Sequence, residues 1–400
     1  MKHKFPHIET INDVLPYIKD KDNFIVIDKD DYTIIDYVVQ SSDTFPNPVI
    51  KGDTFTTELT EHKILRECRG IAFNKEGKII SRPFHKFFNY GEKPEEQTDL
   101  DLPEVVLQKL DGSMIRPLVI DGDIRLATRK GITDVAMQAE EFAAGKENYI
   151  IFISGMINGG FTPIFEWCSR KNQIVLDYPE DSLTLLAVRK NDTGEYIEYE
   201  KLKDIASTFG IPIIVTLGFR EMLSNEQIVE TAKALKDEEG FVMVWPNGHR
   251  MKAKAEWYVT LHRAKEAIGR EKDLIKAYLT TGVDDILPIL PENYKNEVAH
   301  FLAKLTEELV TSCQRLDVIF LNVIKPLPEK FTRKEFALRV LNLDPKYKGI
   351  MFQLLTGQPC MEIVIPILLN ACQSKKKLDE FRWLIGGIRF GEKSNGEEAA

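Results

Sequence analysis

The chain contains a lysine whose setting could make it a nucleophile, Lys109, in the pattern Lys-x-Asp-Gly at 109–112. The apolar run 105–108 ends just before it, so a sheet could hold the lysine rigidly while its amine faces a cleft. The pattern is short, and at residue frequencies of roughly 6–7% it arises by chance about once in ten chains of this length. Alone it would usually mark a hairpin lysine that points into water, so other residues must support the chemical interpretation.

Two acidic positions could assist such a lysine, and each has a simpler alternative. Glu166 lies among apolar and aromatic residues in the run Thr-Pro-Ile-Phe-Glu-Trp, and a buried carboxylate needs a partner such as a hydroxyl or a cation. That partner could be a ribose hydroxyl, or the acid could be structural and bonded to backbone amides. Glu238 and Glu239 precede the apolar run 241–244, where paired acids can bind Mg²⁺ or can simply form a charged turn.

Lys252 and Lys254 alternate along a run with strand character, so both ammonium groups should emerge on one face. Two like charges on one face repel each other unless an anion lies between them. A triphosphate is one candidate for that anion, and plain solvent is the alternative.

These elements follow one order along the chain: Lys-x-Asp-Gly, an acid beside aromatic residues, Glu-Gly-Phe, then Lys-x-Lys. Covalent nucleotidyltransferases, which include RNA ligases, DNA ligases and mRNA capping enzymes, show the same order. The segments 69–71, 81–89, 185–189 and 257–262 resemble the bacteriophage RNA ligase 1 family, which seals RNA ends broken in tRNA. The resemblance is strong over about residues 60–265 and looser over the whole length.

The resemblance implies a reaction with ATP and a role in it for each motif residue. Lys109 resembles the lysine that attacks the α-phosphate of ATP to form a lysyl–AMP phosphoramidate. Glu166 is similar to the acid that holds the ribose hydroxyl, and Glu239 to the acid linked to the metal. The residues similar to the family's remaining ATP-binding positions are Gly240, where the backbone approaches closely, the phosphate-binding pair Lys252 and Lys254, and the upstream Arg69 and Lys86.

Other residues resemble auxiliary positions of the family. Phe88 matches an upstream aromatic position, and Lys130 resembles an additional lysine, aligned across a one-residue insertion. Tyr258, with Trp257, resembles the aromatic pair after the last lysine. Asp284 aligns with an acidic residue near the metal site, and a helix N-cap is the alternative. The implied cofactors are ATP and Mg²⁺, with Mn²⁺ as a substitute.

Lysine has an ordinary pKa near 10.4 and is protonated at pH 7, so Lys109 must be activated. We expect Lys252, Lys254 and Mg²⁺ to lower its pKa by disfavouring the charged form. The same cations would neutralise the α-phosphate and the leaving pyrophosphate. Arg69 and Lys86 are expected to hold the 5′-phosphate of RNA in the later steps, since arginine can bind phosphate through two hydrogen bonds.

The elements that must position these residues change character along the chain. From residue 1 to about 262, short β-rich runs alternate with turns, and hairpins are expected at 75–77, at the Asp-Gly pairs 111–112 and 121–122, and at Asn247-Gly248. The runs on both sides of Asn247-Gly248, through about 261, have mostly strand character. Helices are expected at 133–144 and 225–236. The pattern predicts an α+β nucleotidyltransferase domain with largely antiparallel sheets.

Residues 263–390 are predicted to form an all-helical C-terminal domain. Apolar residues recur at helical spacing through 296–324, and Pro326 and Pro328 then end the helix. Thr332 and Glu335 resemble a capping box that opens a helix reaching about 341. Further helices are expected near 348–356, 361–372 and 374–385, and the tail 391–400 is expected to be disordered.

The composition is that of a globular protein with 43% hydrophobic and 29% charged residues. No apolar run is long enough to span a membrane and the start lacks a secretory signal, which favours the cytoplasm. Five scattered cysteines show no zinc-binding spacing and are expected to be reduced and structural. The net charge of −9 argues against a protein that coats nucleic acid by bulk attraction, but it allows a local cationic groove.

The sequence therefore predicts an ATP-dependent RNA ligase, of tRNA repair type, that acts as a monomer on single-stranded RNA or tRNA ends. One alternative is an ATP-dependent DNA-nick ligase, although such enzymes usually carry a small β-barrel where this chain has helices. A second alternative is an inactive RNA-binding relative that kept the fold.

Overall fold

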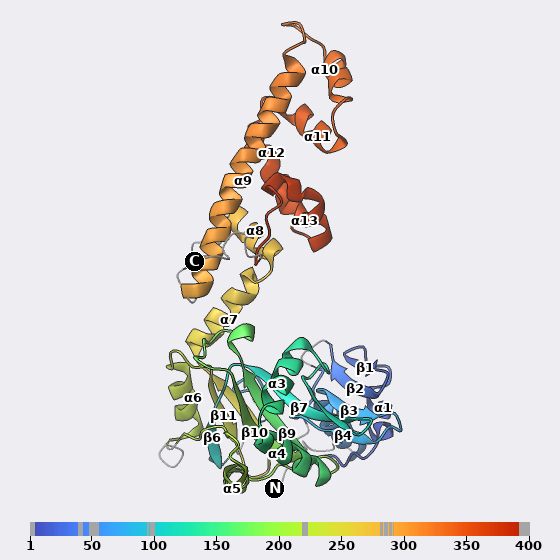
Figure 1. The fold of residues 1–400 in the computed structure, drawn as a ribbon, viewed down its shortest axis with the longest axis vertical. Helices are drawn as coiled ribbons and strands as arrows, with labels where there is room; N and C mark the ends of the chain where they lie inside the picture. The colour runs from blue at the N-terminus through green and yellow to red at the C-terminus, as the bar shows by residue number, and fades with distance from the viewer. Residues whose placement is uncertain are drawn as a thin grey trace. The chain divides into compact units, whose positions relative to one another are not determined.

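Figure 1 shows the fold in the computed structural model, which describes residues 5–38, 43–47, 56–93, 96, 101–217, 223–280, 283, 287, 290 and 292–391. Contacts divide the chain into two units, Met1–Val259 and Thr260–Ala400. The described strands all lie in the first unit, and the described elements of the second are helices, so the predicted α+β class is confirmed. The predicted domain limits at 262 and 390 remain predictions.

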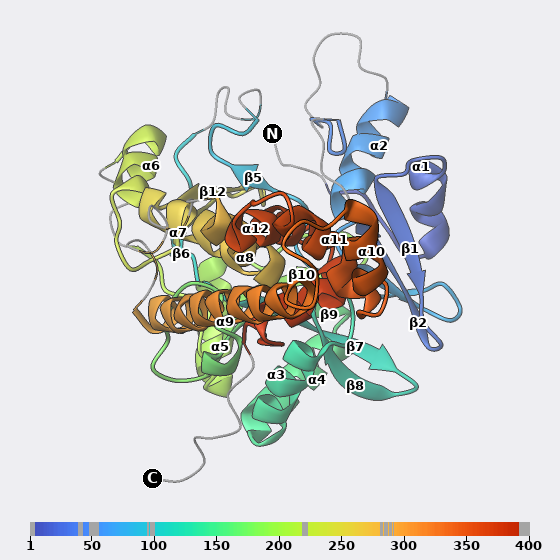
Figure 2. The ribbon, with the colours of Figure 1, turned by 90° about the horizontal axis from the view of Figure 1, so that it is seen from above.

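The N-terminal sheet is antiparallel, in the order β1-β2-β3-β4. Helices α1 and α2 lie beside it (Figure 2), and Ile35, Ile64 and Phe73 share one buried core there. The hairpin predicted at 75–77 is confirmed, since Gly77 adopts φ +76° between β3 and β4. The elements are η1 (Ile11–Asp13), α1 (Leu15–Ile18), β1 (Phe24–Asp28), β2 (Tyr32–Tyr37), α2 (Thr56–Glu67), β3 (Ile71–Asn74) and β4 (Ile79–Ser81).

A second antiparallel sheet has the order β10-β9-β7-β8, and helices α3, α4 and α5 pack on it. Phe152, Phe165 and Leu202 lie in the buried core between them. The turn at 121–122 is confirmed as a hairpin, because both residues have positive φ, as a tight Asp-Gly turn requires. The elements are β7 (Ser113–Ile120), β8 (Asp123–Ala127), α3 (Asp134–Ala144), α4 (Glu147–Asn158), β9 (Phe161–Cys168), η3 (Arg170–Asn172), β10 (Ser182–Lys190) and α5 (Tyr199–Phe209).

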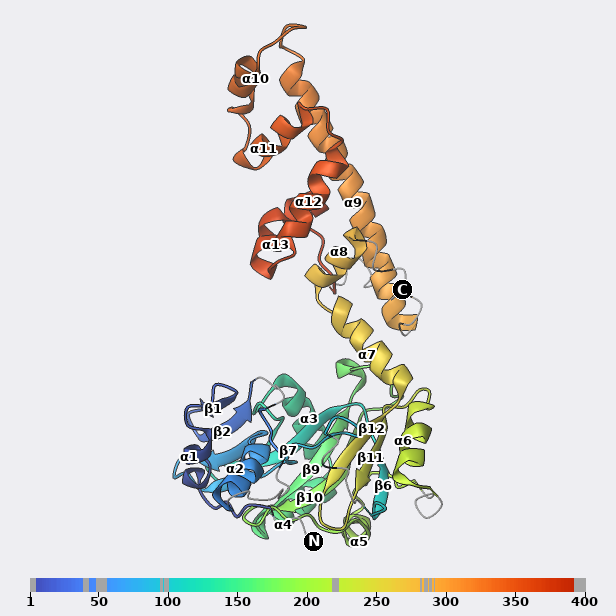
Figure 3. The ribbon, with the colours of Figure 1, turned by 180° about the vertical axis from the view of Figure 1, so that it is seen from behind.

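The third sheet has the order β5-β12-β11-β6, with only the short β5 parallel to its neighbour. Helix α6 covers one face (Figure 3), where Ile228, Met243 and Met251 are buried together. The Asn247-Gly248 turn between β11 and β12 is confirmed, with Gly248 at φ +84°. The elements are β5 (Phe88–Asn89), β6 (Val105–Gln108), α6 (Asn225–Lys233), β11 (Gly240–Val244) and β12 (Arg250–Lys254).

The hairpin expected at 111–112 is wrong. Strand β6 pairs with β11, whereas β7 pairs with β8 and β9, so residues 109–112 cross from one sheet to the other. A Cβ atom on Gly112 would lie 2.4 Å from the carbonyl oxygen of Trp167. The glycine therefore permits the crossing segment to lie directly against β9, the strand that β7 pairs with.

The strand character expected through 261 is also wrong beyond Lys254, because α7 begins at Glu256. Tyr258, Leu261 and Ala264 recur at helical spacing and are all buried, so packing overrides the strand preference of this β-branched and aromatic segment. Helix α7 (Glu256–Ile268) continues past the limit between the two units.

The second unit is built around one helix of 33 residues, α9 (Glu292–Ile324). The predicted capping box is confirmed, since Glu335 N donates to Thr332 Oγ1 at 3.3 Å and Thr332 N donates to Glu335 at 2.7 Å. No helix among the described residues is long and apolar enough to cross a bilayer. The tail from 392 onward lies outside the described residues. The remaining helices are α8 (Glu271–Leu279), α10 (Arg333–Val340), α11 (Pro345–Leu354), α12 (Cys360–Ala371), α13 (Lys375–Phe381) and η6 (Arg382–Ile385).

Candidate active site

A cavity of about 310 Å³ lies between the second and third sheets and is lined by both. Six of the predicted site residues line it: Arg69, Lys86, Lys109, Glu166, Lys252 and Lys254. One wall is otherwise apolar, with Leu107 and Val242 on the third sheet facing Leu186 on the second. The cavity thus combines a group of cations with an apolar slot.

Lys109 and Lys254 share the carboxylate of Glu239. Lys109 Nζ lies 2.7 Å from Glu239 Oε2, and Lys254 Nζ lies 3.0 Å from Oε1. Gly240 also contacts the lysine segment, because its carbonyl oxygen accepts a hydrogen bond from the Lys109 amide at 2.8 Å. Glu239 is 3% exposed, so these two lysines supply the charge that a buried carboxylate needs.

The expectation that neighbouring cations lower the pKa of Lys109 is wrong for this arrangement. Burial acts to lower that pKa, but the nearby carboxylates of Glu239, Glu166 and Asp111 outweigh burial, and the pKa is raised above its ordinary value. Lys109 is therefore an ammonium held by Glu239. It becomes a nucleophile only when that ion pair is weakened.

Glu166, on β9, keeps a proton more readily than an ordinary glutamate. Burial raises its pKa to about 7, although the charge of Lys109 acts in the opposite direction. The backbone amide of Gly112 bonds to this carboxyl. A group that is partly protonated at pH 7 can both accept and donate a hydrogen bond, which suits a sugar hydroxyl.

Lys252 carries the least stable positive charge in the cavity. Cross-strand pairing sets Lys252 opposite Val242 and Lys254 opposite Gly240, so both lysines lie on the face of β12 that lines the cavity. Burial, together with the charges of Lys86, Lys109, Arg69 and Lys254, lowers the pKa of Lys252 to about 7. A bound polyanion would remove this repulsion and favour the charged lysine.

Lys86 and Arg69 lie at the side of the cavity formed by the N-terminal sheet. Lys86 Nζ is 5.1 Å from the ring centroid of Phe88 and 5.3 Å from that of Tyr37. Phe88 does not line the cavity and acts instead as part of the aromatic support for Lys86. Tyr37 lines the cavity but was not predicted, since only its place at the end of a strand marks it in the sequence.

Asp111 fixes the turn that carries Lys109, which the sequence did not reveal. Its Oδ1 accepts a hydrogen bond from the Tyr258 hydroxyl at 2.7 Å, and its Oδ2 accepts from the amides of Val175 and Leu176, each at 2.7 Å. Its own amide donates to the hydroxyl of Tyr178 at 2.9 Å. The aromatic residue predicted after Lys254 thus contributes by holding Asp111.

Two predicted residues are not brought into the cavity. Lys130 is exposed and does not line it. Its neighbour Arg129 is closer to the site: Nε lies 3.1 Å from Asp36, and the guanidinium carbon lies 4.5 Å from the Tyr37 ring centroid. Asp284 falls outside the described residues.

The carboxylates suit a cation held mainly by a bound polyphosphate. Within the described ranges, no three His, Cys, Asp or Glu side chains form a ready metal cage. Glu239 and Glu166 both act on the Lys109 amine, and Mg²⁺ typically takes one or two carboxylates and completes its shell with substrate phosphates and water. These two acids fit that pattern.

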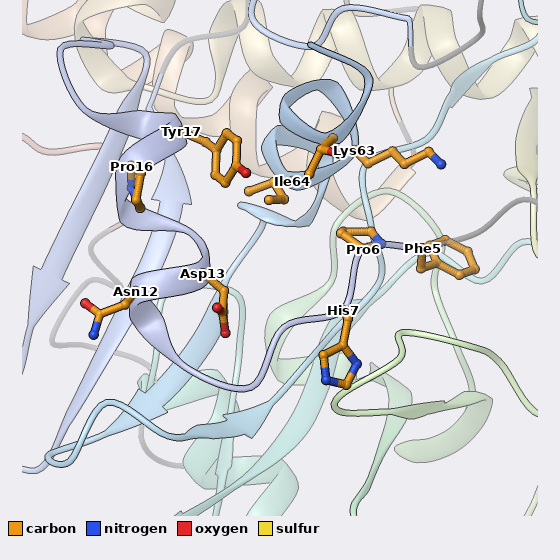
Figure 4. Close-up of a pocket in the computed structure, with 10 residues that line it drawn as sticks. Phe5, Pro6, His7, Asn12, Asp13, Pro16, Tyr17, Lys63 and Ile64 are labelled. Carbon is orange, nitrogen blue, oxygen red and sulfur yellow. The ribbon is translucent and has the colours of Figure 1, made fainter. Parts of the chain in front are cut away.

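A larger hollow of about 450 Å³ lies elsewhere, between residues 5–17 and helix α2 (Figure 4). Its side chains include Phe5, His7, Tyr17 and Lys63, and none of the predicted site residues lines it. The chemistry-bearing residues gather in the smaller cavity, so volume alone does not identify the site.

Comparison with known proteins agrees with this location. The family model described as RNA ligase matches residues 67–258, the span that holds Lys109 and its partners. A putative RNA ligase of Thermovibrio ammonificans is 29% identical over 331 residues, covering 78% of this chain and 80% of that protein. RNA ligase 1 of bacteriophage TS2126 is 31% identical over 156 residues, 36% of this chain and 39% of that protein. The RNA ligase of Rhodothermus phage RM378 is 24% identical over 356 residues, 70% of this chain and 79% of that protein.

Proposed function

Because this chain belongs to the bacteriophage RNA ligase 1 family, we propose that it uses ATP to join the 5′-phosphate and 3′-hydroxyl ends of single-stranded or broken RNA. The observation that carries the proposal is the cavity in which Lys109 shares Glu239 with Lys254, beside Lys252 and Glu166. It offers a nucleophile, cations for a polyphosphate and an apolar slot for a base.

In the first step the neutral amine of Lys109 attacks the α-phosphorus of ATP. A phosphorus–nitrogen bond forms, the bond from the α-phosphorus to the bridging oxygen breaks, and pyrophosphate leaves with the electron pair. Lys252 and Lys254 stabilise the charge that grows on the phosphate oxygens. A divalent cation near Glu239 and Glu166 would supply further positive charge there.

In the later steps the AMP passes to RNA and is released. An oxygen of an RNA 5′-phosphate attacks the AMP phosphorus, and the bond to Lys109 breaks. The 3′-hydroxyl of a second end then attacks the RNA phosphorus of the resulting 5′–5′ pyrophosphate linkage, and AMP leaves. Arg69 and Lys86, on the side of the N-terminal sheet, are suited to hold the donor phosphate.

Labelling with ATP that carries a label on its α-phosphate tests the nucleophile. The wild-type chain should retain the label after denaturation, and Lys109→Ala should retain none. Lys75→Ala is a matched control, because Lys75 is exposed and pairs with Asp31 at 2.8 Å, and it should label like the wild type. Full labelling of Lys109→Ala would overturn the assignment, and labelling by GTP instead of ATP would indicate a capping enzyme.

Incubation with ATP, Mg²⁺ and 5′-phosphorylated substrates tests the substrate class. Circles or joined products from single-stranded RNA are expected, with less product from nicked duplexes. Sealing of duplex nicks alone would favour the DNA-nick ligase alternative. Labelling without any sealing of RNA or DNA would contradict the ligase proposal.

We also propose that the enzyme acts as a monomer in the cytoplasm on ends such as those of broken tRNA. The described cysteines are all free and buried, as expected of a chain in a reducing compartment. Sedimentation of the purified chain tests the monomer, and a mass of twice 45.8 kDa would contradict it.

A further inference from the structure

Arg250 is a third cation on the face of β12 that already carries Lys252 and Lys254. Residues at every second position of a strand share a face, and Arg250 also lines the cavity. No prediction from the sequence assigned it a role. The proposed mechanism, which needs cations only near the phosphates, does not use it either.

Arg250 lies at the end of the cavity farthest along β12 from the nucleophile. Same-face neighbours in a strand are roughly 6.6–6.8 Å apart, which sets Arg250 about 13 Å along β12 from Lys254, the partner of Glu239. Pairing places Val242 opposite Lys252, and the cavity is lined by Val242, Leu107 and Leu186 as well as by Arg250, so the apolar slot lies between Lys252 and Arg250. A nucleotide whose phosphates lie at Lys252 and Lys254 would extend its base along this slot.

The guanidinium also forms part of the rear wall of the slot. A second cavity of about 310 Å³ lies behind it, and both cavities are lined by Leu107, Leu186 and Arg250. Arg250 is 5% exposed. It is therefore a buried donor at the place where a base in the slot would end.

The charge of Arg250 has no carboxylate partner among the described residues. Its guanidinium carbon lies 4.4 Å from the ring centroid of Tyr196 and 5.2 Å from that of Phe84. The guanidinium donates a hydrogen bond to the Tyr196 hydroxyl, but its Nε is buried without a hydrogen-bond acceptor. Two other buried arginines, Arg82 and Arg189, by contrast, both bond to Glu67. A buried donor without an acceptor is costly, so an acceptor supplied by a ligand would stabilise it.

We propose that Arg250 is a specificity-determining residue that donates a hydrogen bond to a ring nitrogen of the adenine base. Adenine offers three such acceptors, N1, N3 and N7, and an apolar slot that ends in a donor suits a flat base with an acceptor at its edge. This inference rests on the proposed use of ATP. It adds a contact to the base, whereas the lysines of β12 contact the phosphates.

Binding of ATP and of its 1-deaza, 3-deaza and 7-deaza analogues, measured by calorimetry on the full-length chain, tests the contact. Each analogue replaces one ring nitrogen with C–H. With the wild type, one of the three should bind about 10- to 100-fold more weakly than ATP. With Arg250→Met, ATP should weaken by a similar factor, and that one analogue should now bind as well as ATP does. Equal binding of all four ligands by the wild type would overturn the proposal.

Two comparisons separate a base contact from a merely structural role. If Arg250→Met weakens ATP and all three analogues by one common factor, Arg250 supports the fold of the site and the proposal fails. Arg125→Met is the matched control, since Arg125 lies outside the cavity and pairs with Glu140 at 2.8 Å, and it should bind like the wild type. The wild-type analogue series needs no variant and stays informative even if Arg250→Met does not fold.

Labelling of Lys109 tests the proposed function, and binding of the analogues tests the base contact, so the two can fail independently. A wild-type chain that binds ATP but is never labelled contradicts the ligase step and leaves the base contact standing. A chain that is labelled normally but shows no analogue preference contradicts the base contact alone.

Discussion

At the scale of single residues, the site stabilises the charged forms of its lysines to different extents. Lys109 is stabilised as an ammonium by Glu239, whereas Lys252 forms no ion pair with a carboxylate in the part of the chain that the structure describes. Binding of phosphate favours a charged Lys252, and the loss of a proton from Lys109 is required for attack. A proton therefore leaves one lysine of the cavity while another lysine of the same cavity becomes easier to protonate.

Replacing Lys252 by Met should make the fold more stable and the enzyme less active. The folded-state pKa of Lys252, about 7, lies below its ordinary value of 10.5, so the folded chain bears a cost that is full below pH 7 and vanishes above pH 10.5. Lys252→Met should therefore raise the free energy of unfolding by about 1–3 kcal/mol at pH 6 and by less at pH 9.5. Denaturant titrations at both pH values measure the gain.

The same variant should lose about 100-fold in the rate of ATP labelling, because a donor to the phosphates is gone. Lys254→Met is the control for stability, since Lys254 is paired with Glu239 and its removal leaves that carboxylate with one partner fewer. A Lys252→Met chain that is less stable than the wild type at pH 6 would contradict the account of its buried charge.

A residue of the cavity could be predicted from the sequence only if it belongs to a recognisable short motif. Lys109, Glu166 and Lys252 come from separate short motifs, and the structure brings them together. Asp111 and Tyr37 depend on partners 147 and 49 positions away, Tyr258 and Lys86 respectively, and no local pattern indicates such contacts. Arg250 alternates with Lys252 and Lys254, but it belongs to no motif of its own.

At the scale of elements, a buried carboxylate ties the N-terminal sheet to the second sheet. Glu67, at the end of α2, accepts hydrogen bonds from Arg189 on β10, two of them at 2.7 Å, and from Arg82 just after β4 at 3.1 Å. All three side chains are essentially unexposed. The cluster sets the position of the N-terminal sheet, which supplies Arg69 and Lys86 to the cavity.

Glu67→Gln should destabilise the fold by about 3–5 kcal/mol, because it leaves two buried arginines without their counter-charge. The pKa of Glu67 is lowered from 4.5 to about 2, so its contribution to stability is complete above pH 4.5 and is lost as the pH falls toward 2. The stability of the wild type should fall over this range and that of Glu67→Gln much less, as denaturant titrations at pH 3 and 6 would measure. Glu200→Gln, an exposed acid 3.7 Å from Lys203, is the control and should match the wild type.

The residue types at turns predicted the hairpins well, whereas the pairing of strands that are distant in the sequence could not be predicted. The hairpins at Gly77, Gly122 and Gly248 each need a positive φ that glycine adopts at little cost, so the residue types mark them. Pairing of β6 with β11 joins segments more than 130 residues apart, which no neighbouring residue specifies. The sequence predicts a strand at the start of α7 because Trp, Tyr and Val favour strands, whereas buried contacts at helical spacing stabilise the helix.

At the scale of the whole molecule, the first unit should carry out the ATP step without the second. The cavity is lined only by residues up to Lys254, and Tyr258 adds the bond to Asp111. A chain of residues 1–268, which keeps all of α7, should be labelled by ATP at a rate close to that of the full chain. A chain of residues 1–255 lacks Tyr258 and should be labelled far more slowly.

Labelling by both truncated chains, compared with the full chain, measures the contribution of α7. Failure of the 1–268 chain, if it is folded by circular dichroism, would show that the helical unit takes part in the ATP step. Equal labelling of the two truncated chains would contradict the role of the Tyr258 hydroxyl. Sealing of structured RNA by the 1–268 chain then reports what the helical unit adds to the choice of substrate.

The crossing at 109–112 has a consequence for the kinetics of the site. The nucleophile stands on a joint between two sheets, where Asp111 makes four hydrogen bonds and Gly112 packs against a backbone carbonyl. These contacts hold residues 109–112 in one conformation, so no loop movement is needed to bring the lysine into its reactive position. The turnover rate should therefore be limited by substrate binding and by separation of the Lys109–Glu239 ion pair, and not by a conformational change of the segment that carries Lys109.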